Sequence, residues 1–275
     1  SSKSITPAEA ITYYHQRLSA HNNALNCAVE IFPLEQMLAH PLAAGPLHGI
    51  PGLVKDNICQ KGRLTTAASK ILTNFVAPYE ATVSKRMQAA GALSLGRSNM
   101  DEFAMGASGE FSAYGSTKNP WDLTRSPGGS SAGAAAAVAA GLVPWALGTE
   151  TGGSVRQPAS FCGLVGLYPT YGLFSRFGLL AFCSSTDQPG PITKTVRDNA
   201  IVASVISGND PADATSLPEQ SHDFTQYLTG SLPKNFRIGV LRDALESTGI
   251  DEQVKASFQQ AVARLEQMGA TISYV

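Results

Sequence analysis

Residues 126–141 read SPGGSSAGAAAAVAAG, and this stretch limits the fold more than any other in the chain. Glycine, serine and alanine make it too apolar for a linker and too small-sided for an ordinary core. Alanine is the best helix former and glycine commonly follows a helix end, which predicts a helix over 132–140 that stops at Gly141. Because its side chains are so small, other backbone segments can approach this helix closely.

Strand and helix patterns alternate on either side of this stretch. Thr6-Pro7-Ala8-Glu9 reads as a capping box with proline at the first helical position, which predicts a helix through Tyr14 and Leu18. Other segments predict strands at 50–54, 92–95, 236–241 and 270–275, and helices at 80–90, 100–105 and 254–268. This alternation is typical of an α/β fold whose sheet is covered by helices on its faces. The last strand runs to Val275, so we expect an unfinished sheet that a longer protein or another chain completes.

Composition excludes several classes of function. The 275 residues carry a formal net charge of −1, which creates no long-range field for collecting phosphates. We therefore expect no nucleic-acid site except through a partner. No apolar run reaches the roughly 18 residues of a membrane span, and the first residues lack the apolar segment of a secretory signal. We expect a cytoplasmic protein that does not enter a membrane.

Cysteines and histidines show no metal-binding pattern. The four cysteines, at 27, 59, 162 and 183, have no C-x-x-C spacing and no neighbouring histidine in a zinc pattern. The five histidines form no H-E-x-x-H group. We therefore expect buried free thiols in a reducing cytosol, with no metal and no cofactor in this chain.

A second glycine-rich stretch, GTETGGSVRQP over residues 148–158, could present a nucleophile. Consecutive glycines before Ser154 can adopt backbone angles closed to other residues, so successive N–H groups can turn toward one point beside the serine hydroxyl. Acyl transfer needs such donors, aimed in advance at the developing oxyanion. Taken alone, a glycine-rich turn with an exposed serine is the commoner case.

A serine nucleophile needs a base, and no histidine lies in a suggestive context. Lys55 follows the apolar run 50–54 and precedes Asp56-Asn57. Burial there would disfavour its charged form and bring its pKa toward the operating pH. The alternative, a surface lysine at a strand end, is the more frequent situation for lysine.

Two rival serine motifs are present. Residues 129–133 fit the G-x-S-x-G elbow with Ser131 as nucleophile, and residues 231–234 fit the S-x-x-K motif. The elbow must follow a strand, whereas residues 119–127 read as a loop. The S-x-x-K motif needs a helix, and Pro233 disfavours one. We expect neither to be a site.

Three strings, residues 128–140, residues 148–163 and Lys55-Asp56-Asn57, together resemble the amidase signature family. The resemblance implies a triad of a lysine, a serine in a cis peptide and a serine nucleophile, which fall on Lys55, Ser130 and Ser154. It places the oxyanion donors on the backbone N–H groups of Thr151, Gly152, Gly153 and Ser154. It also implies an α/β fold with a mixed central β-sheet covered by α-helices on both faces, in which 1–275 is a single domain, truncated at its C-terminal side.

Further strings resemble one branch of that family, the A subunits of glutamyl-tRNA(Gln) amidotransferases; they occupy residues 99–106, 118–122, 156–159, 169–172 and 187–191. The branch implies hydrolysis of glutamine to glutamate and ammonia. The ammonia would reach B and C partner subunits, where ATP and Mg serve to activate tRNA-bound glutamate, so tRNA is met only through a partner. Two other functions stay open: a free-standing amidase for a small or aryl carboxamide, and an inactive fragment or assembly scaffold.

The sequence departs from the family pattern at three positions: Glu150 replaces a usual aspartate, Ala132 a usual glycine and Tyr168 a common lysine. Glu150 adds a methylene beside the oxyanion loop, where small displacements lower catalytic rate. We expect Arg156 to pair with Glu150 and brace this loop, the alternative being an exposed arginine. Members of the branch are much longer, so we expect the groups that bind the ends of the substrate to lie outside this chain.

Overall fold

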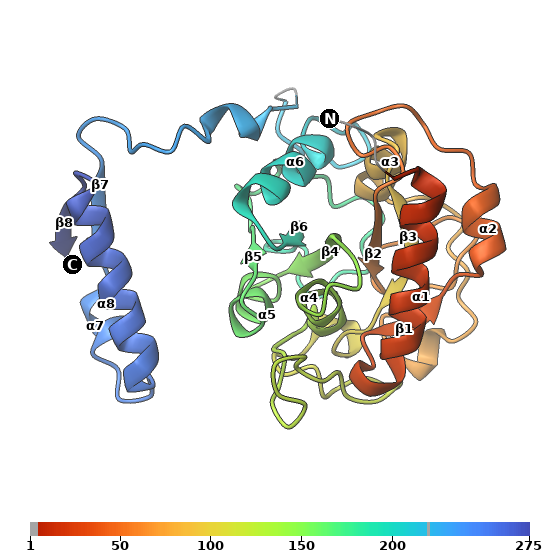
Figure 1. The fold of residues 1–275 in the computed structure, drawn as a ribbon, viewed down its shortest axis with the longest axis horizontal. Helices are drawn as coiled ribbons and strands as arrows, with labels where there is room; N and C mark the ends of the chain where they lie inside the picture. Colours follow the sequence, from red (N-terminus) through yellow and green to blue (C-terminus); the bar gives the residue numbers. More distant parts are fainter. Residues whose placement is uncertain (1–4, 219–220) are drawn as a thin grey trace. The chain divides into compact units, whose positions relative to one another are not determined.

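The computed structural model describes residues 5–218 and 221–275, which divide into two compact units, one through Thr225 and one from Gln226 onward. The first unit contains β1 to β6 and α1 to α6, and the second contains β7, α7, α8 and β8 (Figure 1). Three short 3-10 helices complete the elements: η1 (Lys70–Leu72), η2 (Glu102–Ala104) and η3 (Phe224–Tyr227). A single domain over 1–275 stays a prediction.

A six-stranded mixed sheet forms the first unit, in the order β1–β3–β2–β4–β6–β5. Its strands are β1 (Ala28–Ile31), β2 (Pro51–Lys55), β3 (Leu93–Ser98), β4 (Trp145–Glu150), β5 (Val165–Gly166) and β6 (Gln188–Thr193). β2 runs parallel to β3 and to β4, whereas β1, β5 and β6 pair antiparallel with their neighbours. The carboxyl ends of β2, β3 and β4 therefore meet at one edge of the sheet.

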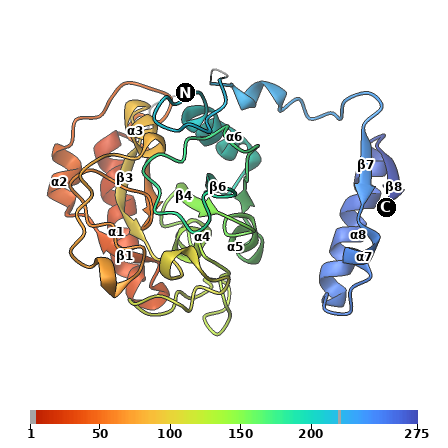
Figure 2. The same ribbon diagram turned by 180° about the vertical axis from the view of Figure 1, so that it is seen from behind.

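Helices cover both faces of this sheet (Figures 1 and 2). They are α1 (Pro7–Leu25), α2 (Leu34–Ala39), α3 (Thr82–Ala89), α4 (Ala132–Ala139), α5 (Arg156–Phe161) and α6 (Val196–Ile206). Successive strand residues point to opposite faces: Leu53 of β2 joins a core with α1, α4 and α5, and Val54 joins a core with α3 and α6. Ala146 and Leu147 of β4 divide in the same way. The expected fold class is confirmed.

The alanine-rich helix is α4, and it is buried from Ala132 to Val138. A Cβ on Gly133 would lie 2.6 Å from the backbone nitrogen of Asn99, so only glycine lets this helix meet the loop after β3. Gly141 follows the helix with a φ of 67°, in the left-handed region that favours glycine. The predicted close approach of other backbone segments is confirmed.

Local signals predicted some other elements well and one poorly. The capping box at the start of α1 is present, with the Glu9 N–H donating to Thr6 Oγ1 at 3.2 Å. The strand expected at 92–95 is β3, which continues to Ser98. The helix expected at 100–105 is wrong: only η2 forms there, and Phe103 has a φ of 51°. Asp101 accepts two backbone N–H groups from farther along the chain, which favours a loop over a helix.

The second unit contains β7 (Arg237–Val240), α7 (Arg242–Leu245), α8 (Glu252–Gln267) and β8 (Thr271–Tyr274). β7 and β8 pair in parallel, and the two strands and the helix predicted here are confirmed. Within α8, Val262 is buried whereas Val254 and Phe258 are 62% and 47% exposed. No helix in residues 5–218 and 221–275 has both the length and the apolar character needed to cross a membrane.

Candidate active site

Lys55 ends β2, a central strand of the sheet, and is fully buried. Its Nζ lies 2.7 Å from Ser130 Oγ and donates to the Thr149 carbonyl oxygen at 3.1 Å. Burial lowers the pKa of Lys55 to about 7. Three carboxylates oppose this shift by attracting the charged form: Asp101, Asp187 and Glu150. Near neutral pH the amine can therefore be uncharged, with a lone pair for the Ser130 proton.

Ser130 lies just before α4 and is also fully buried. The peptide bond between Gly129 and Ser130 is cis, as the family resemblance implied. The Gly129 N–H donates to the Gln157 side-chain oxygen at 2.9 Å, and the Ser130 carbonyl accepts the Asp101 N–H at 3.2 Å. Hydrogen bonds thus hold the backbone on both sides of the cis bond.

The expected oxyanion loop follows β4. The N–H groups of Gly152, Gly153 and Ser154 donate to no other atom in the described part of the chain. Gly153 has a φ of 120°, which strongly favours glycine, and a Cβ on Gly152 would meet nothing within 4 Å. Free donors beside open space can bind an oxyanion. The Thr151 hydroxyl points elsewhere and donates to the Asp187 carboxylate.

Ser154 is nearly buried, with 9% of its surface exposed. Its carbonyl oxygen accepts the Ser131 N–H at 3.1 Å, so the two serine-bearing segments lie side by side. Its hydroxyl makes no hydrogen bond within residues 5–218 and 221–275. The structure therefore assembles the Lys55–Ser130 contact but not a hydroxyl contact between Ser130 and Ser154. Catalytic hydrogen bonds often tighten only in the complex with substrate.

Glu150 and Arg156 pair as predicted. Glu150 Oε1 accepts Arg156 Nε at 2.7 Å, and Oε2 accepts the N–H groups of Val155 and Arg156 at 3.0 and 2.9 Å. Arg156 is 57% exposed, and its guanidinium lies 5.1 Å from the ring centroid of Tyr168. The carboxylate of Glu150 thus ties the residues after Ser154 to the end of β4.

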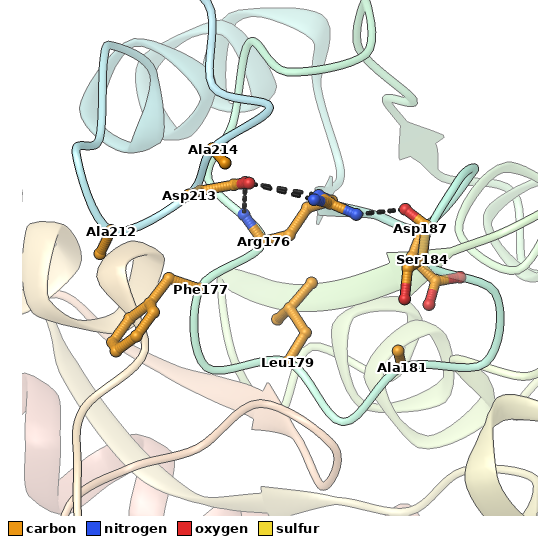
Figure 3. A pocket seen from close by; sticks show the side chains of 9 residues that line it. All are labelled: Arg176, Phe177, Leu179, Ala181, Ser184, Asp187, Ala212, Asp213 and Ala214. Carbon is orange, nitrogen blue, oxygen red and sulfur yellow. Dashed lines mark hydrogen bonds and ion pairs between the residues drawn. The ribbon is translucent and has the colours of Figure 1, made fainter.

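Two carboxylates to which the sequence assigned no role lie at this site, Asp101 and Asp187. Asp187 precedes β6 and accepts the N–H groups of Phe182 and Cys183 at 2.8 and 3.0 Å, besides the Thr151 hydroxyl. It also lines a pocket of about 310 Å³, shown in Figure 3. Their positions next to strand ends mark both residues as candidates in the sequence, but do not specify which groups they contact.

Arg176 lines this pocket together with the carboxylates Asp187 and Asp213, and it is paired with Asp213. Its Nη2 lies 3.1 Å from Asp213 Oδ1, and its Nη1 donates to the Ser184 carbonyl oxygen (Figure 3). These bonds join the segments of the pocket wall that carry Arg176, Ser184 and Asp213.

The rival serines lie in unsuitable places. Ser131 is fully buried, and its hydroxyl donates to the Thr149 carbonyl oxygen at 3.2 Å and accepts the Thr149 N–H at 3.3 Å. Residues 231–234 form no helix. Both observations agree with the expectation that neither motif is a site.

The cysteines are free, but not all are buried. Cys27, Cys59 and Cys162 are buried, whereas Cys183 is exposed in the loop before β6, which corrects the expectation of four buried thiols. Across the described residues, no group of three or more His, Cys, Asp or Glu side chains could hold a metal ion.

The sequence profile of the Amidase family matches residues 9–275. This chain belongs to the amidase signature family. Among curated relatives, the A subunit of glutamyl-tRNA(Gln) amidotransferase from Prochlorococcus marinus is 55% identical over 227 residues, 82% of this chain and 46% of that protein. The corresponding protein from Geobacillus stearothermophilus is 55% identical over 238 residues, 86% of this chain and 49% of that protein. The amidase chain spans about half the length of these relatives.

Solved structures agree with this membership. The A subunit of glutamyl-tRNA(Gln) amidotransferase from Thermotoga maritima matches with a TM-score of 0.91 and 44% identity, covering 98% of this amidase chain and 58% of that protein. The peptide amidase from Stenotrophomonas maltophilia matches with a TM-score of 0.87 and 36% identity, and the match covers 98% of this chain and 59% of that enzyme. The amidase signature fold is thus shared with enzymes named for different substrates.

Proposed function

We propose that this chain forms the amidase centre of a glutaminase subunit, in which Ser154, Ser130 and Lys55 hydrolyse the carboxamide of glutamine. The observation that carries the proposal is the 2.7 Å contact between a fully buried amine, with a pKa of about 7, and the Ser130 hydroxyl. The name shared by the relatives from Prochlorococcus marinus and Thermotoga maritima supports glutamine as the amide.

The proposed reaction runs through a proton relay. Neutral Lys55 accepts the Ser130 proton while Ser130 accepts the proton of Ser154, whose oxygen attacks the carboxamide carbon. The backbone N–H groups of residues 151–154 stabilise the oxyanion. The relay then returns a proton to the departing nitrogen, which leaves as ammonia. Water hydrolyses the acyl-enzyme by the same relay and releases glutamate.

Glu150 and Arg156 act indirectly in this proposal. Their side chains bind each other, and Glu150 also binds the backbone that follows Ser154. By bonding the N–H groups of Val155 and Arg156, Glu150 keeps this segment in one position. The extra methylene of glutamate is compatible with this role, because its carboxylate meets three N–H donors.

We further propose that the ammonia serves B and C partner subunits in the cytoplasm, where ATP and Mg support amidation of tRNA-bound glutamate. The relatives are named as one lettered subunit of an amidotransferase, which supports such partners. The net charge of −1 favours tRNA binding by a partner over binding by this chain. We also propose that 1–275 belongs to a single amidase-signature domain, because the family profile spans 9–275 and includes both units.

A free-standing amidase for a small or aryl carboxamide is the second candidate. The match to the Stenotrophomonas maltophilia peptide amidase, at 36% identity over 98% of this chain, favours it. That enzyme shares the fold without the amidotransferase name. The third candidate, an inactive fragment or assembly scaffold, predicts no turnover of any amide.

Ammonia release from glutamine tests the proposal, with Ser154→Ala as the matched control. We expect wild-type protein to release ammonia, faster when B and C subunits, ATP and glutamyl-tRNA(Gln) are present, and Ser154→Ala to release none. Turnover of peptide or aryl amides without turnover of glutamine would support the second candidate. A fluorophosphonate probe that fails to label Ser154 would support the inactive candidate.

A further inference from the structure

Asp101 is a fully buried carboxylate beside the Lys55–Ser130 pair. It lies beyond the end of β3, and its backbone N–H donates to the Ser130 carbonyl oxygen at 3.2 Å. Its Oδ2 accepts the Gly109 N–H at 3.1 Å, and its Oδ1 accepts the Phe111 N–H at 3.0 Å. One residue therefore bonds both to the relay serine and to the loop that follows η2.

Two glycines make room for this carboxylate. A Cβ on Gly106 would lie 2.5 Å from Asp101 Cγ, and a Cβ on Gly129 would collide with Asp101 Oδ2. The carboxylate consequently packs against the Cα atom of Gly129, the residue on the amino side of the cis bond. A shift of the Asp101 side chain would therefore disturb Gly129 or the 106–111 loop.

The charge of Asp101 also acts on Lys55. Of the three carboxylates that raise the pKa of Lys55 against burial, Asp101 has the largest effect. The other two are Asp187, before β6, and Glu150, at the end of β4. No ion pair joins Asp101 to Lys55 within the described residues, and the Lys55 amine bonds instead to Ser130 and Thr149. The Asp101 carboxylate therefore raises the pKa of Lys55 without forming a hydrogen bond to its amine.

We propose that Asp101 is a positioning residue of this site: it fixes the Ser130 backbone and places a negative charge near Lys55 without bonding to its amine. This inference rests on the proposed roles of Lys55, Ser130 and Ser154. A residue of this kind keeps the Ser130 hydroxyl within reach of the base while it opposes the effect of burial on the base. Asp101 itself transfers no proton.

The test is the rate at which a fluorophosphonate probe labels Ser154 between pH 5 and 9. Wild-type protein is compared with Asp101→Asn and with Asp122→Asn, a control at a half-exposed carboxylate whose partners are its own neighbours Thr124 and Arg125. Without the Asp101 charge the pKa of Lys55 falls further. The acid limb, which is the part of the curve of labelling rate against pH where the rate rises with pH, therefore moves to lower pH. The plateau rate should also fall roughly ten- to hundredfold, because an amide keeps one acceptor oxygen for the Gly109 and Phe111 N–H groups and the packing against Gly129, next to Ser130, is disturbed. Asp122→Asn should match wild type.

Gly106→Ala separates placement from charge. The added Cβ presses on the Asp101 carboxylate but leaves its charge in place, so the plateau should fall while the acid limb stays near its wild-type pH. An unmoved limb in Asp101→Asn overturns the inference. If circular dichroism shows that Asp101→Asn is unfolded, the test rests on Gly106→Ala. A plateau labelling rate equal to that of the wild type in Gly106→Ala then overturns the inference.

Probe labelling needs no glutamine, so the two proposals can fail separately. If the probe labels Ser154 but the protein releases no ammonia from glutamine, the glutaminase function is rejected. The comparison of Asp101→Asn with wild type remains valid in that case. A wild-type protein that is not labelled at any pH overturns both.

Discussion

Lys55 Nζ and Ser130 Oγ lie 2.7 Å apart in a fully buried contact. Because the pKa of Lys55 is lowered to about 7, the amine is charged below that pH and cannot accept the Ser130 proton. For glutamine hydrolysis, kcat/KM should therefore rise about tenfold per pH unit below pH 7 and level off above it. Steady-state rates from pH 5 to 9 measure this. A profile that keeps rising toward roughly pH 10, as for an ordinary lysine, contradicts it.

Lys55→Met should stabilise the fold in acid. The folded-state pKa of about 7 lies below the ordinary value of 10.5, so the unfolded chain binds more protons between these values. The buried lysine thus costs most stability below pH 7, and the cost fades as pH rises to 10.5. The gain from methionine should be on the order of a few kcal/mol at about pH 6 and smaller at about pH 9. Urea unfolding at both pH values checks this, and equal gains would count against it.

The two glycines before Ser154 should respond differently to alanine. Gly153 has a φ of 120°, so Gly153→Ala strains the loop and should lower kcat roughly a hundredfold, as loss of an oxyanion donor does. A Cβ on Gly152 would meet nothing within 4 Å, so Gly152→Ala should fold normally and lower kcat less than about tenfold. Thermal unfolding and kcat, measured for both variants, distinguish them. Equal losses of kcat in the two variants would show that the backbone conformation of the glycine does not determine the effect of the alanine.

Glu150→Gln should cost more activity than Arg156→Ala. The glutamate carboxylate accepts two backbone N–H groups and the arginine side chain, whereas the arginine is 57% exposed. A glutamine amide keeps only one acceptor oxygen. The variant therefore loses either the bonds to the two backbone N–H groups or the bond to the arginine side chain. We expect roughly a tenfold loss of kcat for Glu150→Gln and less for Arg156→Ala, with KM little changed. A larger loss of kcat in Arg156→Ala than in Glu150→Gln would show that the arginine contributes more to activity than the glutamate.

Elements with strong local signals could be predicted from the sequence. The capping box at Thr6 and Glu9 begins α1, and the alanine run becomes α4. β6 gave no such signal, because Pro189 and Pro191 lie within it. These prolines pair with Thr149 and Leu147 of β4, so contacts distant in sequence make that segment a strand. Proline within a strand normally argues against one.

The site divides in the same way. Lys55, Ser130 and Ser154 stand in recognisable strings, and the pairing of Glu150 with Arg156 spans only six residues. Asp101 and Asp187 each bond to a residue that is distant in sequence and lies at the same sheet edge: Ser130 for Asp101 and Thr151 for Asp187. No local pattern specifies such contacts, because the order of strands in the sheet decides them.

Ser130 should act with Lys55 as one unit, since Ser130 is the only proposed link from the amine to Ser154. Ser130→Ala and Lys55→Met should each lower kcat/KM by roughly a thousandfold or more. The double variant should be no more than about threefold slower than the slower single variant, because a relay that is already broken cannot be broken again. The cycle of wild type, two single variants and the double variant measures this. Losses that multiply would mean that Lys55 reaches Ser154 by another route, and the contact at 2.7 Å would then not be the path of the proton.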